Sequence, residues 1–291
     1  MSEATIGIIG GSGLYQMEAM TDVSEVHVDT PYGAPSDAII TGTLEGKRVA
    51  FLPRHGKGHR LNPSEVPYRA NIYALKTLGV ERVISVNAVG SLRQDMPPMD
   101  IVIPDQIIDR TRGRASTFFE KGIVAHVAFA EPFCSELCSI VRDAAGASGA
   151  RVHDGGTYIA MEGPQFSTRA ESELYRFWKA DIIGMTAIPE AKLAREAEMC
   201  YAVVAFVTDY DCWYPEHSSV TTEMVIKALV TGADTARSIV TQAVRAMPEE
   251  RHCSCQFALS DAIVTAPHLV SENIRKNLGP IAGRYFSEPR K

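Results

Sequence analysis

Residues 201–211, Tyr-Ala-Val-Val-Ala-Phe-Val-Thr-Asp-Tyr-Asp (YAVVAFVTDYD), decide the fold class of this chain. The apolar run 201–207 predicts a strand that is buried on both faces, because neither of its faces is polar. Such a strand belongs to a sheet that helices cover on both sides. Similar apolar runs recur along the chain, at 6–9, 47–52, 82–86, 101–103, 157–161 and 181–185.

Helical patterns separate these strand candidates. Apolar residues near helical spacing predict a helix over 65–78, with Gly79 available to end it in a left-handed conformation. Ser167 or Thr168, followed by a glutamate, forms a capping-box pattern that predicts a helix over 168–180. Two more helices are expected over 188–198 and from 221 to beyond Gly232. The alternation predicts an α/β fold, in which a single domain has a central mixed sheet flanked by helices.

The composition of the chain excludes some classes of function. The 291 residues are 45% hydrophobic and carry a net charge of -6, so no broad positive field is available for nucleic acid. No apolar stretch is long enough to span a bilayer, and residues 1–13 do not resemble a secretion signal, so we expect a cytoplasmic protein without a membrane partner.

Six cysteines are too few for a disulfide scaffold. The Cys253-Ser254-Cys255 pair cannot supply four zinc ligands, so no metal is expected and a local structural or redox role is favoured.

Three polar or glycine-rich segments follow apolar strands and predict an anion site. Gly10-Gly11-Ser12-Gly13 can present converging N–H groups and a hydroxyl, although a ligand-free turn fits it equally well. Residues 53–60 (PRHGKGHR) crowd basic and imidazole groups that favour a phosphate, with a solvated basic turn as the alternative. Residues 87–92 (NAVGSL) place small and polar residues at another strand end, which is where ligands bind in open α/β sheets.

Two further segments are candidates for contacts with a base and a sugar. Phe166 in 161–167 (MEGPQFS) offers an aromatic face, but it could equally anchor the core. Met185, at the end of the 181–185 run, could lie along a sugar or fill a gap in the core.

Asp209 and Asp211 stand at the end of the deciding strand. A carboxyl partly withdrawn from water can hold a proton near neutral pH and share it with a ring nitrogen. A surface Asx turn is the plain alternative, and a Mg²⁺ site lacks a third carboxylate nearby in the sequence.

Seven ordered segments together resemble one family. They are IGIIGGSGL (6–14), PRHGKGHRLNPSEVPYRANI (53–72), NAVGSL (87–92), AEPFC (130–134), EGPQFSTRAE (162–171), MTAIPEA (185–191) and TDYDCW (208–213). In this order they are similar to the trimeric purine nucleoside phosphorylases, in particular the 5′-methylthioadenosine phosphorylase branch. The resemblance implies a catalytic domain over 1–247 and a C-terminal extension over 248–291 that packs on or near the active site. The extension's CSC element looks like one in some members of the branch, where paired cysteines form a disulfide.

The resemblance also implies residue roles. Phosphate would be bound by Ser12, Arg54, His55, Asn87, Ala88 and Thr186. The nucleoside would contact Phe166, Met185, Thr208, Val225 and, from a neighbouring subunit, His126. Asp209 would be catalytic together with Asp211. The family often has threonine where this chain has Ser12 and Asn87, which leaves the contact of Asn87 open.

The implied reaction is phosphate-dependent cleavage of 5′-methylthioadenosine to adenine and 5-methylthioribose 1-phosphate, by a homotrimer or a dimer of trimers. It needs no cofactor, since inorganic phosphate is a co-substrate, and it serves purine and methionine salvage; adenosine as a further substrate is left open. Asp209, in place of the asparagine of 6-oxopurine phosphorylases, favours a 6-aminopurine. The alternatives are a 6-oxopurine nucleoside phosphorylase, a hydrolytic nucleosidase and a non-catalytic nucleotide-binding protein.

Overall fold

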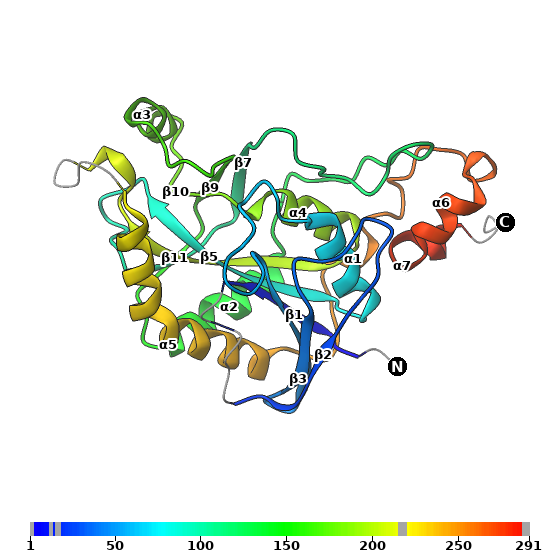
Figure 1. Ribbon diagram of the computed structural model, residues 1–291, viewed down its shortest axis with the longest axis horizontal. Helices are drawn as coiled ribbons and strands as arrows, with labels where there is room; N and C mark the ends of the chain where they lie inside the picture. Colours follow the sequence, from blue (N-terminus) through cyan, green and yellow to red (C-terminus); the bar gives the residue numbers. More distant parts are fainter. Residues whose placement is uncertain (1–2, 12–13, 15–18, 215–219, 287–291) are drawn as a thin grey trace.

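The computed structural model describes residues 3–11, 14, 19–214 and 220–286. These residues form one mixed sheet with helices on both faces, which confirms the predicted fold class (Figure 1). The strands are β1 (Ile6–Gly10), β2 (Thr21–Val26), β3 (Ile39–Leu44), β4 (Lys47–Pro53), β5 (Arg82–Ser91), β6 (Ile101–Ile103), β7 (Gln106–Arg110), β8 (Val152–Asp154), β9 (Thr157–Met161), β10 (Ile182–Gly184) and β11 (Cys200–Asp209). The helices are α1 (Tyr68–Thr77), α2 (Ser135–Ala147), α3 (Arg169–Phe177), α4 (Ala187–Glu196), α5 (Thr222–Ala246), α6 (Glu272–Asn277) and α7 (Gly279–Ala282).

Strand β5 is the centre of the sheet. Its first half pairs in parallel with β1, and its last two residues pair antiparallel with β10. Along its other edge β5 pairs in parallel with β11 over almost its whole length. Because β4 is also parallel to β1, the carboxyl ends of β4, β1, β5 and β11 all lie at one end of the sheet.

Two hydrophobic layers hold the helices to the sheet. Helices α1 and α4 pack with the C-terminal segment on one face, whereas α2 and α5 pack on the other. Strand β11 is buried along its entire length, as its uninterrupted apolar sequence predicts. Each fully buried Leu, Ile or Phe side chain contributes roughly 1.5–3 kcal/mol, so this double burial supplies a rigid support for the residues at the strand ends.

The four predicted helices are present with shifted bounds. Helix α1 begins at Tyr68 rather than at residue 65, directly after Pro67. Thr168 and Glu171 form the expected capping box at the start of α3. Gly79 has a φ of +94°, in the left-handed region that its role after α1 requires. Strands β2, β3, β7 and β8 and helix α2 had not been predicted. In α2 the buried residues Leu137, Val141, Ala144 and Ala145 do follow a helical spacing, which the sequence reasoning overlooked.

Strand β5 is longer than predicted. The sequence placed residues 87–92 in a loop after a strand ending at residue 86, but β5 continues to Ser91. Pairing with β11 and then β10 extends it, since both edges of the strand still find hydrogen-bonding partners there. Asn87 and Ala88 are therefore held by the sheet itself rather than by a turn.

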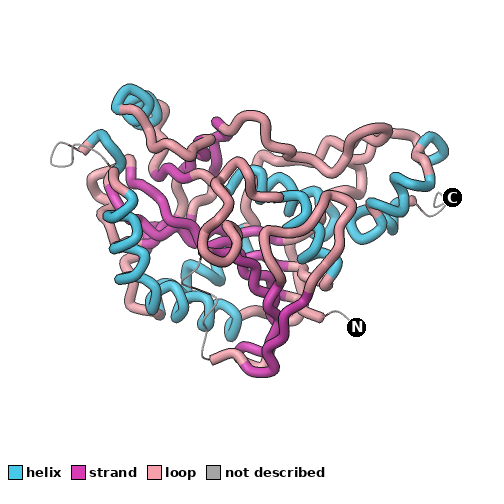
Figure 2. The backbone as a smooth tube through the Cα atoms, in the orientation of Figure 1, coloured by secondary structure: helices cyan, strands magenta, loops and turns pink. Residues whose placement is uncertain are grey.

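Residues 248–286 of the C-terminal extension lie beside α1. Leu259, Leu278 and Ile281 of this segment are buried in the same hydrophobic cluster as α1 and α4. The loop from β7 to α2 runs along the molecule toward α6 and forms a bridge between Ala125 and Ile263 (Figure 2). No helix among the described residues is both long and apolar enough to cross a membrane.

Candidate active site

The strand ends bring together the segments that the sequence singled out. The N–H of Arg54, just after β4, donates to the carbonyl of Gly10 at the end of β1 over 3.0 Å. The Arg54 guanidinium then reaches β5, where Nη1 donates to the Val86 carbonyl over 3.1 Å and Nη2 to Asn87 Oδ1 over 3.0 Å. The three predicted segments therefore converge, although Asn87 lies within β5 and not at its end. Ser12 lies outside the described residues.

The guanidinium of Arg54, which was predicted to bind phosphate, does not face the solvent. Its side chain is 3% exposed, and it forms an ion pair with the fully buried Glu190 of α4, with Nε 2.5 Å from Oε1. Burial alone would lower the pKa of Arg54, but Glu190 raises it above its ordinary value. Among the described residues Nη1 donates only to Val86, so its second N–H is the part of the guanidinium that remains available to an anion.

Glu190 is a residue of this site that the sequence reasoning did not assign. Besides Arg54, the hydroxyls of Ser85 and Tyr201 donate to its Oε2 over 2.9 and 2.8 Å. Four hydrogen bonds thus satisfy a carboxylate that is fully buried. The only signal in the sequence was its place in the MTAIPEA segment.

The crowding of positive charge in residues 53–60 also has an internal explanation. Lys57 forms an ion pair with Glu25 over 2.6 Å, and Arg60 lies 3.7 Å from Asp37. Together with Arg54 and Glu190, three basic side chains of this loop are met by carboxylates of the chain itself. The crowding of charge by itself is therefore no argument for a bound anion, and the phosphate role of Arg54 remains a prediction.

His55 is neutral in this setting. Its pKa is lowered to about 4, first because the ring is buried and then because the Arg54 cation is adjacent. Nδ1 lies 2.8 Å from the Leu61 carbonyl, to which the neutral ring donates its proton. Nε2 is then an acceptor. His55 can donate to a phosphate only after it takes up a proton, so its predicted role couples anion binding to protonation.

Asn87 and Thr186 are linked through Tyr158, and Ala88 follows Asn87 on β5. The antiparallel pairing of Ile183 with Gly90 directs β10 back along β5 toward Ala88 and Asn87, so the chain beyond β10 carries Thr186 to this position. The hydroxyl of Tyr158 on β9 joins β5 to the start of α4, since Asn87 Nδ2 lies 3.4 Å from it and the backbone of Thr186 is hydrogen-bonded to it.

Asp209 lies on the same stretch of β5, paired with Gly90. A Cβ on Gly90 would stand 3.0 Å from Asp209 Oδ1, so glycine leaves the space that the carboxyl occupies. Three residues of strand, about 10 Å, separate Gly90 from Asn87. Arg54, through Asn87, and Asp209, through Gly90, are thus both attached to the C-terminal half of β5.

The carboxyl group of Asp209 is 6% exposed and held from two sides. The backbone N–H of Asp211 donates to Oδ1 over 2.8 Å, and the Thr208 hydroxyl lies 2.7 Å from Oδ2 and 3.2 Å from the Val89 carbonyl. A hydroxyl has one proton. When Thr208 gives it to Val89, its oxygen can accept the proton of a neutral Asp209. The surroundings therefore accommodate both protonation states.

Asp211 lies in a second buried position. Burial raises its pKa above the ordinary value, and among the described residues its Oδ2 and the Ser172 hydroxyl are the buried side-chain atoms without a hydrogen-bond partner. Its φ is +52°, which turns the chain sharply after β11. The bond from the Asp211 N–H to Asp209 Oδ1 is that of an Asx turn, but the turn does not lie at the surface, because both residues are buried.

Phe166 and Met185 differ in their surroundings. Phe166 is 42% exposed, so the alternative that it anchors the core is wrong, and its ring remains available for stacking. Met185 packs over Gly163, where a Cβ would stand 2.5 Å from its sulfur. Arg114 fixes this segment, since Nη1 donates to the Met185 carbonyl over 2.6 Å; this anchor was missed from the sequence.

Val225 and His126, two of the residues predicted to contact the nucleoside, lie in different parts of the fold. Val225 is half-buried in the first turn of α5. His126 is exposed, and its N–H donates to the Ala262 carbonyl in the C-terminal segment. Helices α6 and α7 of that segment lie at the opposite end of the molecule from α3 (Figure 1). One chain therefore does not bring His126 to Asp209, and its expected role in a neighbouring subunit remains a prediction.

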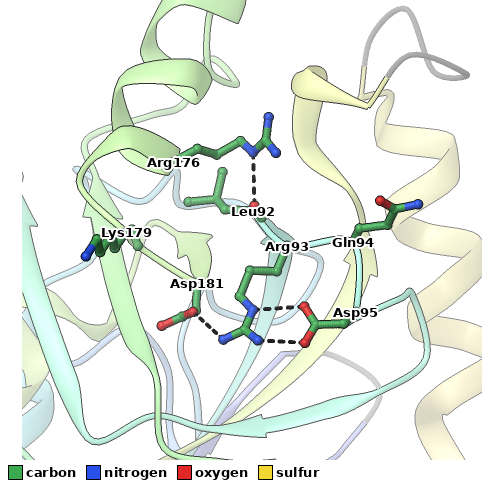
Figure 3. A pocket seen from close by; sticks show the side chains of 8 residues that line it. Leu92, Arg93, Gln94, Asp95, Arg176, Lys179 and Asp181 are labelled. Carbon is green, nitrogen blue, oxygen red and sulfur yellow. Dashed lines mark hydrogen bonds and ion pairs between the residues drawn. The ribbon is translucent and has the colours of Figure 1, made fainter.

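A surface pocket of about 380 Å³ lies near the site but is separate from it. It is formed where β5 ends and β10 begins (Figure 3). Neither Met185 nor Thr186 lines it. Arg93 forms ion pairs there with Asp95 and Asp181, at 2.6 and 2.9 Å. Because Arg93 is already paired with two carboxylates and none of the predicted residues lines the pocket, we do not assign it the chemistry.

Comparison with known proteins places the chain in a family. A family model described as the phosphorylase superfamily matches residues 5–245. The S-methyl-5′-thioadenosine phosphorylase of Chloroflexus aurantiacus is 59% identical over 99% of this chain and 100% of its own length. The enzyme of the same name from Koribacter versatilis is 55% identical over 99% of both chains.

Solved structures agree. A methylthioadenosine phosphorylase from an antarctic soil metagenomic library has a TM-score of 0.93 at 52% identity, covering 97% of this chain and 99% of its own. A mutant adenosine/methylthioadenosine phosphorylase of Schistosoma mansoni in complex with methylthioadenosine has a TM-score of 0.82 at 37% identity, covering 88% and 96%. The chain therefore belongs to the phosphorylase superfamily, within the group of the S-methyl-5′-thioadenosine phosphorylases.

Proposed function

We propose that this chain cleaves 5′-methylthioadenosine with inorganic phosphate, giving adenine and 5-methylthioribose 1-phosphate. The observation that carries the proposal is that buried Asp209 and the Arg54–Asn87–Thr186 group face one stretch of β5, in a chain that matches enzymes of this name along its full length. A nucleoside seated over β5 has its purine beside Asp209 and its sugar above the phosphate.

The reaction follows from this arrangement. The bond between C1′ and N9 breaks, and its electron pair goes to the purine while positive charge builds up on the sugar. Phosphate beneath C1′ stabilises that charge and forms the new C–O bond. A protonated Asp209 donates to N7 of the leaving purine, while the Thr208 hydroxyl and the Asp211 N–H orient its carboxyl group.

The remaining roles belong to the same proposal. Phosphate contacts Ser12, the free N–H of Arg54, protonated His55, Asn87, Ala88 and Thr186. Phe166 stacks on the base, and Met185 and Val225 line the sugar. The enzyme is a cytoplasmic homotrimer of purine and methionine salvage, His126 completes the site of the next subunit, and no cofactor takes part.

The first test is incubation of the purified protein with methylthioadenosine, with and without phosphate. Adenine release that requires phosphate supports the proposal. Release at the same rate without phosphate would identify a hydrolase, and tight binding without release would identify a binding protein. Faster turnover of inosine or methylthioinosine than of methylthioadenosine would favour the 6-oxopurine alternative.

The second test concerns Asp209. Asp209→Asn cannot pass on a proton, so kcat/KM for methylthioadenosine should fall by about 10²- to 10⁴-fold. Turnover of 6-oxopurine nucleosides should fall much less, because an amide can donate to a 6-oxo group. The matched control is Asp95→Asn, an exposed carboxylate in the pocket of Figure 3, which should leave both rates unchanged. An unaltered preference in Asp209→Asn would remove Asp209 from the base site.

A further inference from the structure

Four cysteine sulfurs meet at the end of the sheet opposite the proposed active site. Cys134, Cys200, Cys253 and Cys255 place their Sγ atoms within 4.8 Å of one another. Three of the four are buried, with 2–4% exposure, and Cys253 is half-buried. Each contributes one sulfur, and all six cysteines of the chain are free thiols in the structure.

The four ligands come from three separate parts of the fold. Cys134 is the N-cap of α2, and its N–H donates to the Tyr201 carbonyl over 2.9 Å, which fixes the helix start to β11. Cys200 is the first residue of β11. Cys253 and Cys255 lie in the C-terminal segment, where Cys253 precedes a short 3₁₀ turn that contains Cys255. Regular elements of the core therefore hold two of the thiols in place.

The spacing suits a tetrahedral metal. A Zn–S bond of about 2.3 Å in a tetrahedron separates the sulfurs by roughly 3.8 Å. The cluster, with all sulfurs within 4.8 Å and Cys200 Sγ at 3.2 Å from Cys253 Sγ, needs shifts of only a few tenths of an ångström to one ångström for such a shell. Four protein sulfurs close the shell, as in structural rather than catalytic zinc sites.

We propose that Cys134, Cys200, Cys253 and Cys255 bind one structural zinc ion. Binding releases the four thiol protons to solvent and leaves a Zn²⁺ with four thiolates, a step without oxidation or reduction. The complex carries a net charge of about -2. The N-terminus of α2, a 13-residue helix that Cys134 caps, favours negative charge at this position.

The ion would attach the C-terminal segment to the core. Cys200 and Asp209 are at opposite ends of β11, about 30 Å apart along the strand, so the metal takes no part in the chemistry at Asp209. The sequence predicted no zinc because Cys253 and Cys255 alone cannot fill the shell. Cys134 and Cys200 complete it, and only the path of the chain brings them there.

Metal analysis of the full-length protein tests the proposal. The protein is produced with zinc in the medium and purified without chelators, under a non-thiol reductant. We expect about one zinc per chain by elemental analysis. Cobalt in place of zinc should give the absorption of a tetrahedral cobalt–thiolate centre. The proposal is overturned if the protein is fully reduced but contains no metal. It is also overturned if the mass of the protein is lower than that of the fully reduced chain by two hydrogens for each disulfide, because the thiols are then paired with one another.

Variants separate ligands from neighbours. Cys255→Ser should lower the zinc content to background and remove the loss of thermal stability that a chelator causes in the wild type. Cys138→Ser is the matched control, because Cys138 lies one helical turn from Cys134 but outside the cluster, and it should retain the metal. Zinc retained in Cys255→Ser would contradict the assignment. If that variant does not fold, the metal content and the cobalt spectrum of the wild-type protein still decide whether the four cysteines bind zinc.

Discussion

His55 has its charge set by its surroundings. Burial of the ring and the adjacent Arg54 cation favour the neutral form, so the pKa falls to about 4 although the Nδ1–H bond to the Leu61 carbonyl opposes this shift. In the unfolded chain the same ring has an ordinary pKa of about 6.5. The sequence of residues 53–60 is rich in basic groups, but in the folded protein His55 is neutral.

This difference predicts a pH-dependent loss of stability. A group with a lowered folded-state pKa contributes stability above the unfolded value and loses it as the pH falls from about 6.5 to about 4. The loss from His55 is of the order of 3 kcal/mol. His55→Gln, which can still donate to Leu61, should therefore lose less stability than the wild type over this interval.

Urea unfolding of both proteins at several pH values measures the effect. The difference between the proteins is needed, because burial raises the pKa of Glu196 to about 7 and so adds stability as the pH falls over the same range. Replacing the exposed His268 with glutamine is the control and should leave the pH dependence unchanged. Parallel wild-type and His55→Gln curves would contradict the prediction.

At the scale of elements, one ion pair joins the end of β4 to α4. Arg54 and Glu190 are both buried, and their remaining bonds go to Ser85, Asn87 and Tyr201 on β5 and β11. The pair therefore connects a helix to three strands beneath the proposed active site. A buried charge without its partner is costly, so the two residues depend on each other.

Arg54→Met should destabilise the fold as well as the site. It leaves the Glu190 carboxylate buried and unpaired, which costs about 3–5 kcal/mol. Adding Glu190→Gln removes that charge and should restore part of the loss, as measured by chemical denaturation. The control is Lys57→Met in the same loop, whose pair with Glu25 is exposed and should change stability by less than about 1 kcal/mol. Full stability of Arg54→Met would show that Arg54 serves only a ligand.

At the scale of the whole molecule, one chain does not bring the predicted contact His126 to the residues around Asp209. His126 lies with the C-terminal segment, at the other end of the molecule from α3, whereas the residues around Asp209 are gathered on β5. The proposed homotrimer supplies the missing side chain from a neighbour. Light scattering should accordingly find three chains of 31.7 kDa each.

Mixing two weakened variants tests the shared site. His126→Ala and Asp209→Asn should each have low activity as pure proteins. Co-expressed in equal amounts with different tags, they form trimers in which roughly a quarter of the sites combine an intact Asp209 with an intact neighbouring His126. Activity toward methylthioadenosine should therefore return to roughly a quarter of the wild-type activity. A mixture no more active than its components would place His126 outside the site.

Local patterns in the sequence predicted much of this protein. Unbroken apolar runs identified buried strands such as β11, and a capping box located α3. Polar residues at or near the carboxyl ends of the strands marked the end of the sheet where Asp209, Asn87 and Thr186 lie. These features depend on neighbours within a few residues, so they can be read along the chain.

Only the tertiary structure decided which side chains meet. It paired Arg54 with Glu190, extended β5 by pairing it with β10 and β11, and gathered four cysteines from distant segments. A contact between residues far apart in the sequence depends on the path of the whole chain, and burial then sets the charge of each group that the path brings together. No local pattern contains that information.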